Sequence, residues 1–329
     1  MRRLLVHRVS ITPLVARVIV TGGAGFIGSY VAETFLARGD DVVVVDDLST
    51  GSERNVPARA QLERVDITDA DALAGAFAGG ADVVCHLAAQ ASVLVSAERP
   101  DYDCAVNVLG TLNVLEAARG AGAPVVFAST GGAIYGNGAP LPTPEDYAPK
   151  PLAPYGASKL AAEAYVETWT RLHDVPNVVL RLGNVYGPRQ NPHGEAGVVA
   201  IFSDKLFAGE RPVLRGGGTP KRDYVHVSDV AHAFVLAADG GRGGTFNVGT
   251  GVGTSTARLL ELLQEAAGTS IEPRDEPLKA GELDASVVDT SRIERELGWQ
   301  PTIALEDGLR ETVAWYRDAT SSAEAAGRG

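Results

Sequence analysis

The stretch VIVTGGAGFIGSYVAETFLARG, residues 18–39, decides the fold. A β-branched apolar run ends at Thr21, glycines follow at Gly22, Gly25 and Gly28, and then a segment of helical spacing begins. Glycine lacks a Cβ, so it permits positive φ in a tight turn and lets a ligand approach the backbone closely. The amides at the start of a helix carry partial positive charge and attract phosphate. We therefore predict a strand, a phosphate-binding turn and a helix, in that order.

The next apolar run ends in an acidic residue, Asp46. A carboxylate at this place can accept both ribose hydroxyls of NAD, and it would repel a 2′-phosphate. The alternative is an Asp that merely faces solvent at a strand end. Asp66 follows the third apolar run, where it either faces the adenine of the same cofactor or serves as a helix N-cap in the segment ITDADAL, residues 67–73.

From Val15 onward, β-branched runs of strand length alternate with segments of helical spacing. Continuous apolar runs are typical of parallel strands buried on both faces, so we predict an α/β fold with a doubly wound parallel Rossmann sheet. The predicted strands are 15–20, 41–47, 62–66, 82–89, 124–130 and 177–185, and the predicted helices are 26–39, 71–79, 107–122 and 155–173.

After about residue 186 turn-rich loops separate shorter elements. This change predicts a smaller C-terminal α/β substrate-binding lobe over 186–320, interleaved with a first domain over 15–185 that residues 223–250 rejoin. We expect residues 1–14 and the tail 321–329 to be disordered. The basic opening also resembles a targeting signal, but cleavage just beyond it would remove the first strand, so we interpret 1–14 as a start-site artefact.

The bulk composition excludes several classes of partner. With 29 basic and 41 acidic residues among 329, the net charge of −12 argues against nucleic acid and anionic membrane. Cys85 and Cys104 allow at most one disulfide and have no metal-site spacing, and Cys85 lies in an apolar run as a small buried hydrophobe would. We predict a cytoplasmic protein without a metal.

The segment YGASK places Tyr155 and Lys159 at positions i and i+4, on one face of a predicted helix. A free tyrosine has a pKa near ~10 and is a poor base at neutral pH, so a nearby ammonium that favours the phenolate is chemically needed. The alternative is an ordinary surface pair on an amphipathic helix. Downstream of the glycine turn, we favour a catalytic pair.

The GxxGxxG spacing together with YGASK resembles the short-chain dehydrogenase/reductase superfamily, and the length and C-terminal lobe resemble its extended branch. That resemblance implies a third catalytic residue, a Ser or Thr in the segment FASTGGAIYG, residues 127–136. We assign Thr130, with Ser129 as the alternative donor and a strand-end cap as the role of either if neither is the donor.

Further segments resemble the NAD-dependent nucleotide-sugar epimerases, closest to the UDP-glucose/UDP-galactose 4-epimerases, from Val15 to about Arg317. In related dehydratases and decarboxylases acidic residues follow the Thr, whereas this chain has Gly131 and Gly132 there, which argues for hydride transfer without further acid–base groups.

The resemblance implies three sets of site residues. The catalytic set is Tyr155, Lys159 and Thr130. The implied NAD-binding residues are Gly22, Gly25, Phe26, Ile27, Gly28, Asp46, Asp66, Ile67, Leu87, Ala88, Ala89, Gln90, Asn107, Tyr155 and Lys159. The implied substrate-binding residues are Ser129, Thr130, Tyr155, Asn184, Val198, Val199, Arg222 and Lys279.

Some of these positions have alternatives. Arg222 either binds the diphosphate or pairs at the surface with Asp223 or Glu145. His86, which begins the segment HLAAQ on the nicotinamide side, is interpreted as a satisfied strand-end histidine rather than an acid or a metal ligand. Lys279 stands where relatives usually have Arg, so it is a point charge on the phosphate or makes no contact there.

The resemblance therefore implies a UDP-sugar 4-epimerase with tightly held NAD that interconverts UDP-glucose and UDP-galactose. The resemblance also implies a homodimer through helices near 105–119 and 154–173. Two alternatives stay open. One is the same fold acting on a UDP-N-acetylhexosamine, UDP-glucuronate or a dTDP-sugar, and the other is a non-catalytic NAD-sensing protein.

Overall fold

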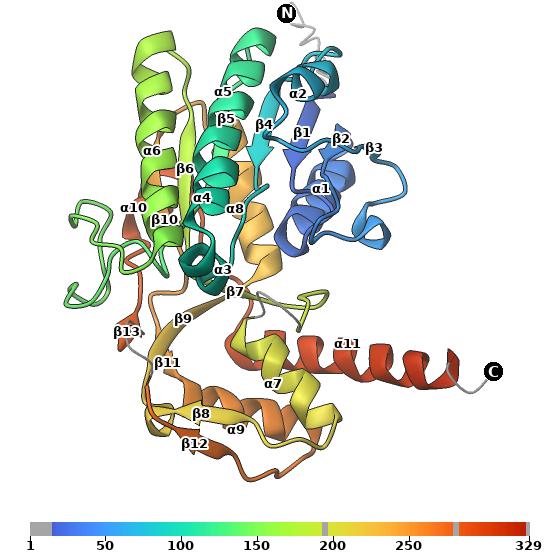
Figure 1. Cartoon of the computed structure of the whole chain (residues 1–329), viewed down its shortest axis with the longest axis vertical. Helices are drawn as coiled ribbons and strands as arrows, with labels where there is room; N and C mark the ends of the chain where they lie inside the picture. The colour runs from blue at the N-terminus through green and yellow to red at the C-terminus, as the bar shows by residue number, and fades with distance from the viewer. Residues whose placement is uncertain (1–14, 193–196, 279–282, 327–329) are drawn as a thin grey trace, which may run out of the picture.

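The computed structural model describes residues 15–192, 197–278 and 283–326. Its main sheet has seven strands in the order β10-β6-β5-β4-β1-β2-β3, and every neighbouring pair is parallel (Figure 1). This confirms the predicted doubly wound parallel sheet. The strands are β1 Arg17–Thr21, β2 Asp41–Val45, β3 Gln61–Glu63, β4 Val83–His86, β5 Val125–Thr130, β6 Val178–Leu182 and β10 Gly244–Val248.

Helices cover both faces of this sheet, which is why its strands read as continuous apolar runs. In β1, Val18 and Val20 pack on the face covered by α1 and α8, whereas Ile19 packs on the opposite face against the core of α2, α5 and α6. The bounds of these helices are α1 Phe26–Arg38, α8 Val227–Asp239, α2 Ala70–Ala76, α5 Gly110–Ala121 and α6 Pro154–His173, with α10 Ser291–Leu297 beside β10.

The segment between β4 and α5 is more helical than the sequence indicated. One uninterrupted helix starts well before the predicted residue 107, and it is composed of α4 Pro100–Cys104, a π-helical turn η2 Ala105–Leu109, and α5. Among the described residues, the short helices η1 Glu53–Asn55, α3 Val93–Glu98 and η3 Gly216–Gly218 also went unpredicted.

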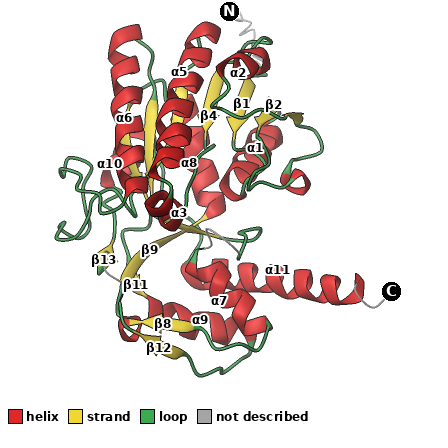
Figure 2. Ribbon diagram, viewed as in Figure 1, coloured by secondary structure: helices red, strands yellow, loops and turns green. Residues whose placement is uncertain are grey.

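The smaller lobe lies below the carboxyl edge of the main sheet (Figure 2). Strand β9 pairs with β7, β11 and β13, β8 pairs with β12, and α7, α9 and α11 pack around one apolar core. The bounds are β7 Asn184–Tyr186, β8 Val213–Arg215, η3 Gly216–Gly218, β9 Lys221–His226, β11 Gly253–Ser255, β12 Arg274–Glu276, β13 Ala285–Ser286, α7 Val198–Phe207, α9 Thr256–Ala267 and α11 Leu305–Ala326.

Two expectations about the chain's organisation need adjustment. Within 223–250, α8 and β10 return to the main sheet, whereas most of β9 belongs to the sheet of the smaller lobe. Helix α11 continues to Ala326, so the tail expected to be disordered from 321 is helical that far, and 1–14 and 327–329 lie outside the described residues. Among the described ranges no helix is both long and apolar enough to cross a membrane.

Candidate active site

The glycine turn lies where the strand order reverses, between β1 and its neighbours β2 and β4, which is where open α/β sheets bind ligands. Gly22 has φ of 72°, and a Cβ there would lie 2.5 Å from the amide nitrogen of Ala88. A Cβ on Gly28 would lie 2.1 Å from the carbonyl oxygen of Gly22. The fold itself therefore requires two of the three glycines.

Gly25 differs, because a Cβ there would meet only the Gly22 carbonyl oxygen, at 3.1 Å, among the described residues. It is the N-cap of α1, no side chain caps that helix, and no acidic residue occupies its first turn. Amides without a side-chain cap suit an anionic group such as a pyrophosphate. The turn thus fits the predicted dinucleotide.

Asp46 is buried at the end of β2, only 7% exposed, so it is not an ordinary solvated strand-end carboxylate. Its Oδ2 accepts from the amide of Ala24 and its Oδ1 from the amide of Leu48, both at 2.9 Å. Burial raises the pKa of Asp46, and these two hydrogen bonds oppose that rise. Each oxygen retains further acceptor capacity, so the group fits a ribose diol beside the glycine turn.

Asp66 is exposed, and its carboxylate accepts from the amide of Thr68 at 2.8 Å. The cap of α2 is Asp69 instead, which accepts from the amide of Ala72 at 3.0 Å. The capping alternative for Asp66 is therefore wrong, and the adenine contact remains a prediction. Its neighbour Ile67 packs its side chain into the core, so only its backbone could face a cofactor.

His86 is a satisfied histidine, as the sequence indicated. Its Nδ1 lies 2.7 Å from the Thr21 hydroxyl, and its Nε2 lies 3.0 Å from the Thr111 hydroxyl, which itself donates to the carbonyl of Asn107. Thr111 must then accept from Nε2–H, so His86 is the neutral Nε2–H tautomer. Complete burial lowers the pKa of His86 to about 3, which keeps it neutral.

The loop from Leu87 to Gln90 is held against α6 through Asn107, which is 1% exposed in the π-helical turn. Asn107 accepts from the Gln90 amide at 2.9 Å, and its Nδ2 donates to the Gln90 carbonyl at 2.8 Å. The same Nδ2 lies 3.1 Å from both Asp103 Oδ1 and Ser158 Oγ. The predicted supporting role of Asn107 therefore has a structural basis, and Asp103 is a partner that sequence reasoning missed.

Tyr155 and Lys159 lie in the first turns of α6, over the end of β5. Tyr155 is partly exposed, whereas Lys159 is only 3% exposed and its Nζ donates to the Ala128 carbonyl at 2.9 Å. Burial lowers the pKa of Lys159 to about 8, against the opposing effect of Asp103 and Glu163. The Lys159 amine is therefore still mostly protonated at neutral pH, and it lies one helical turn from Tyr155, where its charge can favour the phenolate.

The lowered pKa of Lys159 predicts a pH-dependent effect on stability. Between about 8 and the ordinary value near 10.5, unfolded chains bind the proton that folded chains have lost, so the free energy of unfolding rises with pH. Relative to Lys159→Met, cofactor-free wild type should gain on the order of 3 kcal/mol across this window. Denaturant titrations of both proteins at several pH values measure it, and a constant difference would contradict the burial of a charged lysine.

The structure separates the two candidate hydroxyls at the end of β5. Ser129 donates to Glu163 inside the protein, whereas Thr130 Oγ1 accepts from the amide of Ala133 at 3.1 Å. The Thr130 hydroxyl proton is not used by any hydrogen bond among the described residues, so it can donate to a substrate oxygen. This favours Thr130 over Ser129 as the donor.

Replacing Thr130 by valine keeps the shape of the side chain and removes the donor. We expect kcat to fall by about 100-fold, the usual loss when one donor to a developing oxyanion is deleted. Thr130→Ser is the matched control and should retain most of the activity. Steady-state kinetics of both variants test the assignment, which would be abandoned if the valine variant turned over like the wild type.

On the substrate side, Asn184 begins β7 with a buried Oδ1 that has no hydrogen-bond partner among the described residues. This oxygen lies 3.4 Å from where a Cβ on Gly132 would be, so Asn184 faces the turn after Thr130. A buried amide oxygen without a partner is costly unless a ligand satisfies it. Asn184 is therefore placed as a ligand contact would be.

The remaining substrate candidates vary in accessibility. Arg222 donates to the carbonyl oxygens of Lys221 and Leu283, while Asp223 is buried and turned inward to Thr250. Val199 is buried in the core of the smaller lobe, so its side chain is not free for a ligand, whereas Val198 is only partly buried. Lys279 lies outside the described residues.

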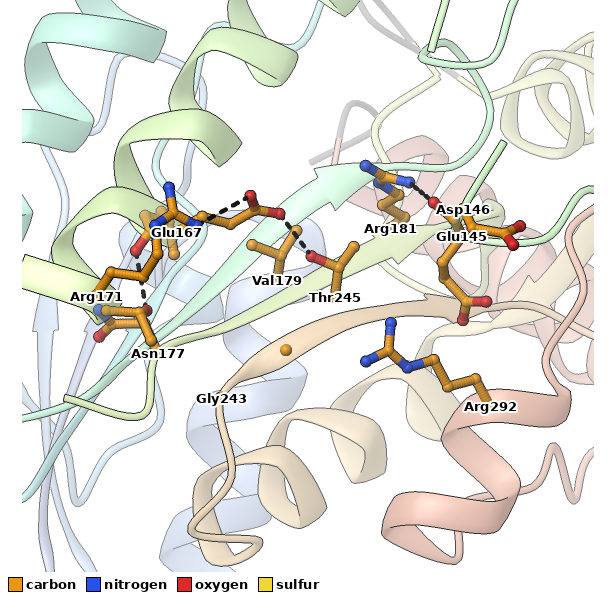
Figure 3. A pocket seen from close by; sticks show the side chains of 13 residues that line it. Glu145, Asp146, Glu167, Arg171, Asn177, Val179, Arg181, Gly243, Thr245 and Arg292 are labelled. Atoms are coloured by element: carbon orange, nitrogen blue, oxygen red, sulfur yellow. Dashed lines mark hydrogen bonds and ion pairs between the residues drawn. The ribbon is translucent and has the colours of Figure 1, made fainter. Parts of the chain in front are cut away.

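A cavity of about 380 Å³ lies elsewhere, at the β10 edge of the sheet (Figure 3). It is bounded by the C-terminal half of α6, strands β6 and β10, and α10, and Glu145 and Arg292 face one another across it. None of the predicted site residues lines it, and its charges are of both signs. It is lined by Glu145, Asp146, Val166, Glu167, Thr170, Arg171, Asn177, Val179, Arg181, Gly243, Gly244, Thr245 and Arg292.

Sequence reasoning also missed Glu163 and Arg181, which form a buried ion pair behind Thr130. Both left a signal in the sequence. Glu163 lies one turn beyond Lys159 on the same face of α6, and Arg181 is a charge inside the apolar run NVVLRLGNV, where a buried partner is required.

Comparison with known proteins agrees with this geometry. The model of the NAD dependent epimerase/dehydratase family matches residues 18–249. The UDP-glucose 4-epimerase of Mycolicibacterium smegmatis is 46% identical over 310 residues, which cover 92% of this chain and 99% of that relative.

Solved structures are similar over the same extent. The Thermotoga maritima UDP-glucose 4-epimerase with UDP-glucose superposes with a TM-score of 0.90 at 42% identity, and the alignment covers 92% of this chain and 99% of that one. The Thermus thermophilus UDP-glucose 4-epimerase complex with NAD gives a TM-score of 0.86 at 46% identity, with the same coverage. The chain therefore belongs to the NAD-dependent epimerase/dehydratase family.

Proposed function

We propose that this protein is an NAD-dependent UDP-sugar 4-epimerase that interconverts UDP-glucose and UDP-galactose. The observation that carries the proposal is that three features meet at the carboxyl ends of the parallel strands. They are the glycine turn, the end of β5 with Thr130, and the start of α6 with Tyr155 and Lys159. The similarity over nearly the whole chain to UDP-glucose 4-epimerases supports the choice of substrate.

The chain's own residues supply the proton chemistry. Tyr155, as phenolate, takes the proton of the sugar 4-hydroxyl, and Thr130 donates a hydrogen bond to the same oxygen. Lys159 stabilises the phenolate with its positive charge, which its burial makes more effective because little solvent screens it. In the second half of each turnover the same tyrosine returns the proton to the sugar 4-oxygen.

NAD, when bound at the glycine turn, supplies the hydride acceptor and donor for the sugar C4. The residues that would hold it are the first turn of α1, Asp46, and the loop from Leu87 to Gln90. The sugar must present both faces of C4 to the cofactor, so it has to rotate during the reaction. The nucleotide must therefore be bound by residues that keep holding it while the sugar rotates. Asn184 and Arg222 are the described residues proposed to hold the diphosphate.

The turn after Thr130 supports a reaction without elimination of water. A Cβ on Gly131 would lie 2.8 Å from the side chain of Val288, so this position has no room for a carboxylate. The nearby carboxylate of Glu163 accepts from Ser129 and Arg181, so it is engaged inside the protein. No acid beyond Tyr155 is then needed.

A panel of nucleotide sugars tests the proposal. The NAD-loaded protein is incubated with UDP-glucose, UDP-galactose, UDP-N-acetylglucosamine, UDP-glucuronate and dTDP-glucose, and proton NMR follows the anomeric signals. Interconversion of the first two without net NADH is the expected result. Epimerisation of only another nucleotide sugar would show that the proposed substrate is wrong. Retention of NAD without epimerisation of any sugar would favour a non-catalytic NAD sensor.

A homodimer and a cytoplasmic location are part of the proposal. Exposed apolar side chains lie along the segments from η2 to α6, among them Leu109 at 50%, Tyr165 at 39% and Leu172 at 66% exposure. Apolar exposure of this kind on two neighbouring helices suits a helix-to-helix interface. Both described cysteines are free, which suits a reducing compartment. Light scattering of the purified protein measures the oligomeric state.

A further inference from the structure

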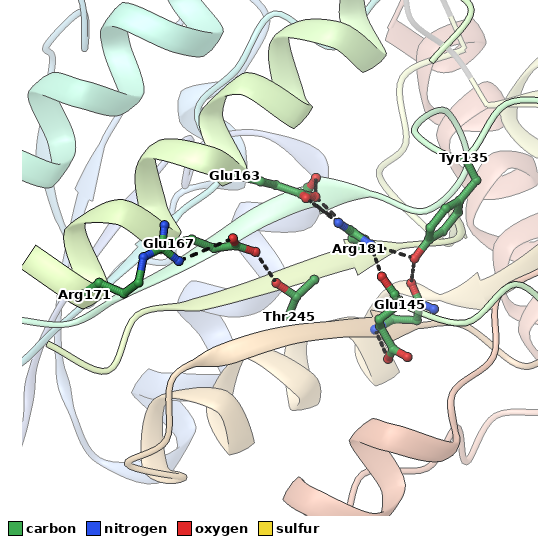
Figure 4. A network of polar contacts seen from close by, with 9 residues as sticks. Tyr135, Glu145, Glu163, Glu167, Arg171, Arg181 and Thr245 are labelled. Carbon is green, nitrogen blue, oxygen red and sulfur yellow. Dashed lines mark hydrogen bonds and ion pairs between the residues drawn. The ribbon is translucent and has the colours of Figure 1, made fainter. Parts of the chain in front are cut away.

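The ion pair between Glu163 of α6 and Arg181 of β6 is almost completely buried, with side chains 2% and 6% exposed (Figure 4). Arg181 Nε lies 3.0 Å from Glu163 Oε1, and Arg181 NH2 lies 2.7 Å from Oε2, so the two groups meet as parallel forks. Replacing such a pair by apolar residues is often neutral or stabilising, so its presence points to a role other than stability.

On one side, the pair holds the residue before Thr130. Ser129 and Arg181 are direct neighbours across the β5–β6 ladder, and the Ser129 hydroxyl donates to Glu163. Lys159 donates to the carbonyl of Ala128, one residue earlier in β5. Side chains from two successive turns of α6 therefore form hydrogen bonds to Ala128 and Ser129, the two residues of β5 immediately before Thr130.

On the other side, the pair holds Tyr135, which follows the turn that contains Gly131 and Gly132. Arg181 NH1 donates to the hydroxyl of Tyr135 and to the carbonyl of Glu145, each at 3.0 Å. The Tyr135 hydroxyl donates in turn to Asn247 Oδ1 at 2.7 Å. The segment between Ser129 and Tyr135 contains Gly131 and Gly132, whose backbones are intrinsically less restricted than those of other residues.

We propose that Glu163 and Arg181 are positioning residues for the reaction. They fix both ends of the glycine-containing turn 130–134, and so keep the Thr130 hydroxyl at a constant position relative to the Tyr155 hydroxyl. This rests on the proposed function. One guanidinium–carboxylate unit reaches the turn from both sides, because Glu163 holds Ser129 and Arg181 holds Tyr135. A displacement of about 1 Å at a reacting group costs on the order of 100-fold in rate, so such a constraint has a large kinetic effect.

Three substitutions test this in the NAD-loaded protein. Ser129→Ala and Tyr135→Phe each release one end of the turn and leave the ion pair in place, and each should lower kcat about 10-fold with KM unchanged. Glu163→Gln disrupts both ends and should lower kcat about 100-fold. Since Ser129 acts through Glu163, adding Ser129→Ala to Glu163→Gln should change kcat little further. A merely structural role predicts neither the kcat-specific loss nor this non-additivity.

Hydrogen–deuterium exchange supplies a readout that needs no substrate. The peptide covering 129–136 should exchange faster in all three variants, while peptides from α9 stay unchanged. Thr312→Val is the matched control, because it deletes an equally buried hydroxyl that donates within α11 to the Gly308 carbonyl. It should leave kcat and exchange of the 129–136 peptide unchanged.

The outcomes separate the two proposals. Wild-type kcat in Ser129→Ala and Tyr135→Phe, or unchanged exchange of the 129–136 peptide, would overturn the positioning role, even if Glu163→Gln fails to fold. A wild type that epimerises no nucleotide sugar would instead refute the proposed function, and the exchange measurements would still report whether the pair holds the turn.

Discussion

Replacing Tyr155 by phenylalanine lowers kcat by about 1,000-fold while NAD stays bound, because the substitution removes the proton acceptor and keeps the aromatic ring. The ring keeps its place at the start of α6, one helical turn before the buried Lys159. Steady-state kinetics with UDP-galactose and absorbance of the retained cofactor measure the two properties separately.

The matched control is Tyr165→Phe, on the same helix. Tyr165 is 39% exposed and packs edge-to-face on Trp169, away from the carboxyl edge of the sheet. It should retain wild-type kcat. Near wild-type turnover in the Tyr155 variant would show that another group accepts the proton and would remove the central residue of the proposed mechanism.

Gly28→Ala should weaken NAD binding by on the order of 100-fold, as expected for roughly 3 kcal/mol of overpacking. The added Cβ would lie 2.1 Å from the Gly22 carbonyl oxygen and 2.8 Å from its carbonyl carbon. Both are backbone atoms, so α1 must move away from the turn. Its N-terminal amides then no longer point at the pyrophosphate. Isothermal titration of the cofactor-free protein with NAD measures the change.

Two further glycine variants separate the causes. Gly75→Ala in α2 meets no heavy atom within 4 Å and should leave NAD affinity unchanged while stabilising the helix slightly. Gly25→Ala should lower the melting temperature less than Gly28→Ala, because its Cβ would meet only the Gly22 carbonyl oxygen among the described residues, at 3.1 Å, but it should still weaken NAD binding. If Gly25→Ala bound NAD normally, the N-terminus of α1 would not be the pyrophosphate site.

Features that depend on neighbouring residues were predictable from the sequence. The turn at Gly22–Gly28 follows from a strand, glycines and a helix in succession, and the parallel sheet follows from apolar runs without alternation. The pairing of Tyr155 with Lys159 on one face follows from helical geometry alone. In each case the physical cause lies within one or two turns of chain.

Features that depend on contacts between distant segments were not predictable. The helix around Asn107 starts earlier and contains a π-helical turn, which brings Asn107 to Gln90 and Ser158. Local propensity does not specify such a turn, since it depends on what the helix packs against.

The sequence by itself determined the sheet, the glycine turn and the placement of Tyr155 and Lys159 on one helix face, because hydrophobic period and residue spacing encode them directly. Only the tertiary structure favours Thr130 over Ser129 as the proposed donor, because Ser129 donates to Glu163 of α6, which Arg181 of β6 in turn holds. Hydrogen bonds between residues tens of positions apart leave no periodic trace in a chain, so they become visible only once the strands are paired.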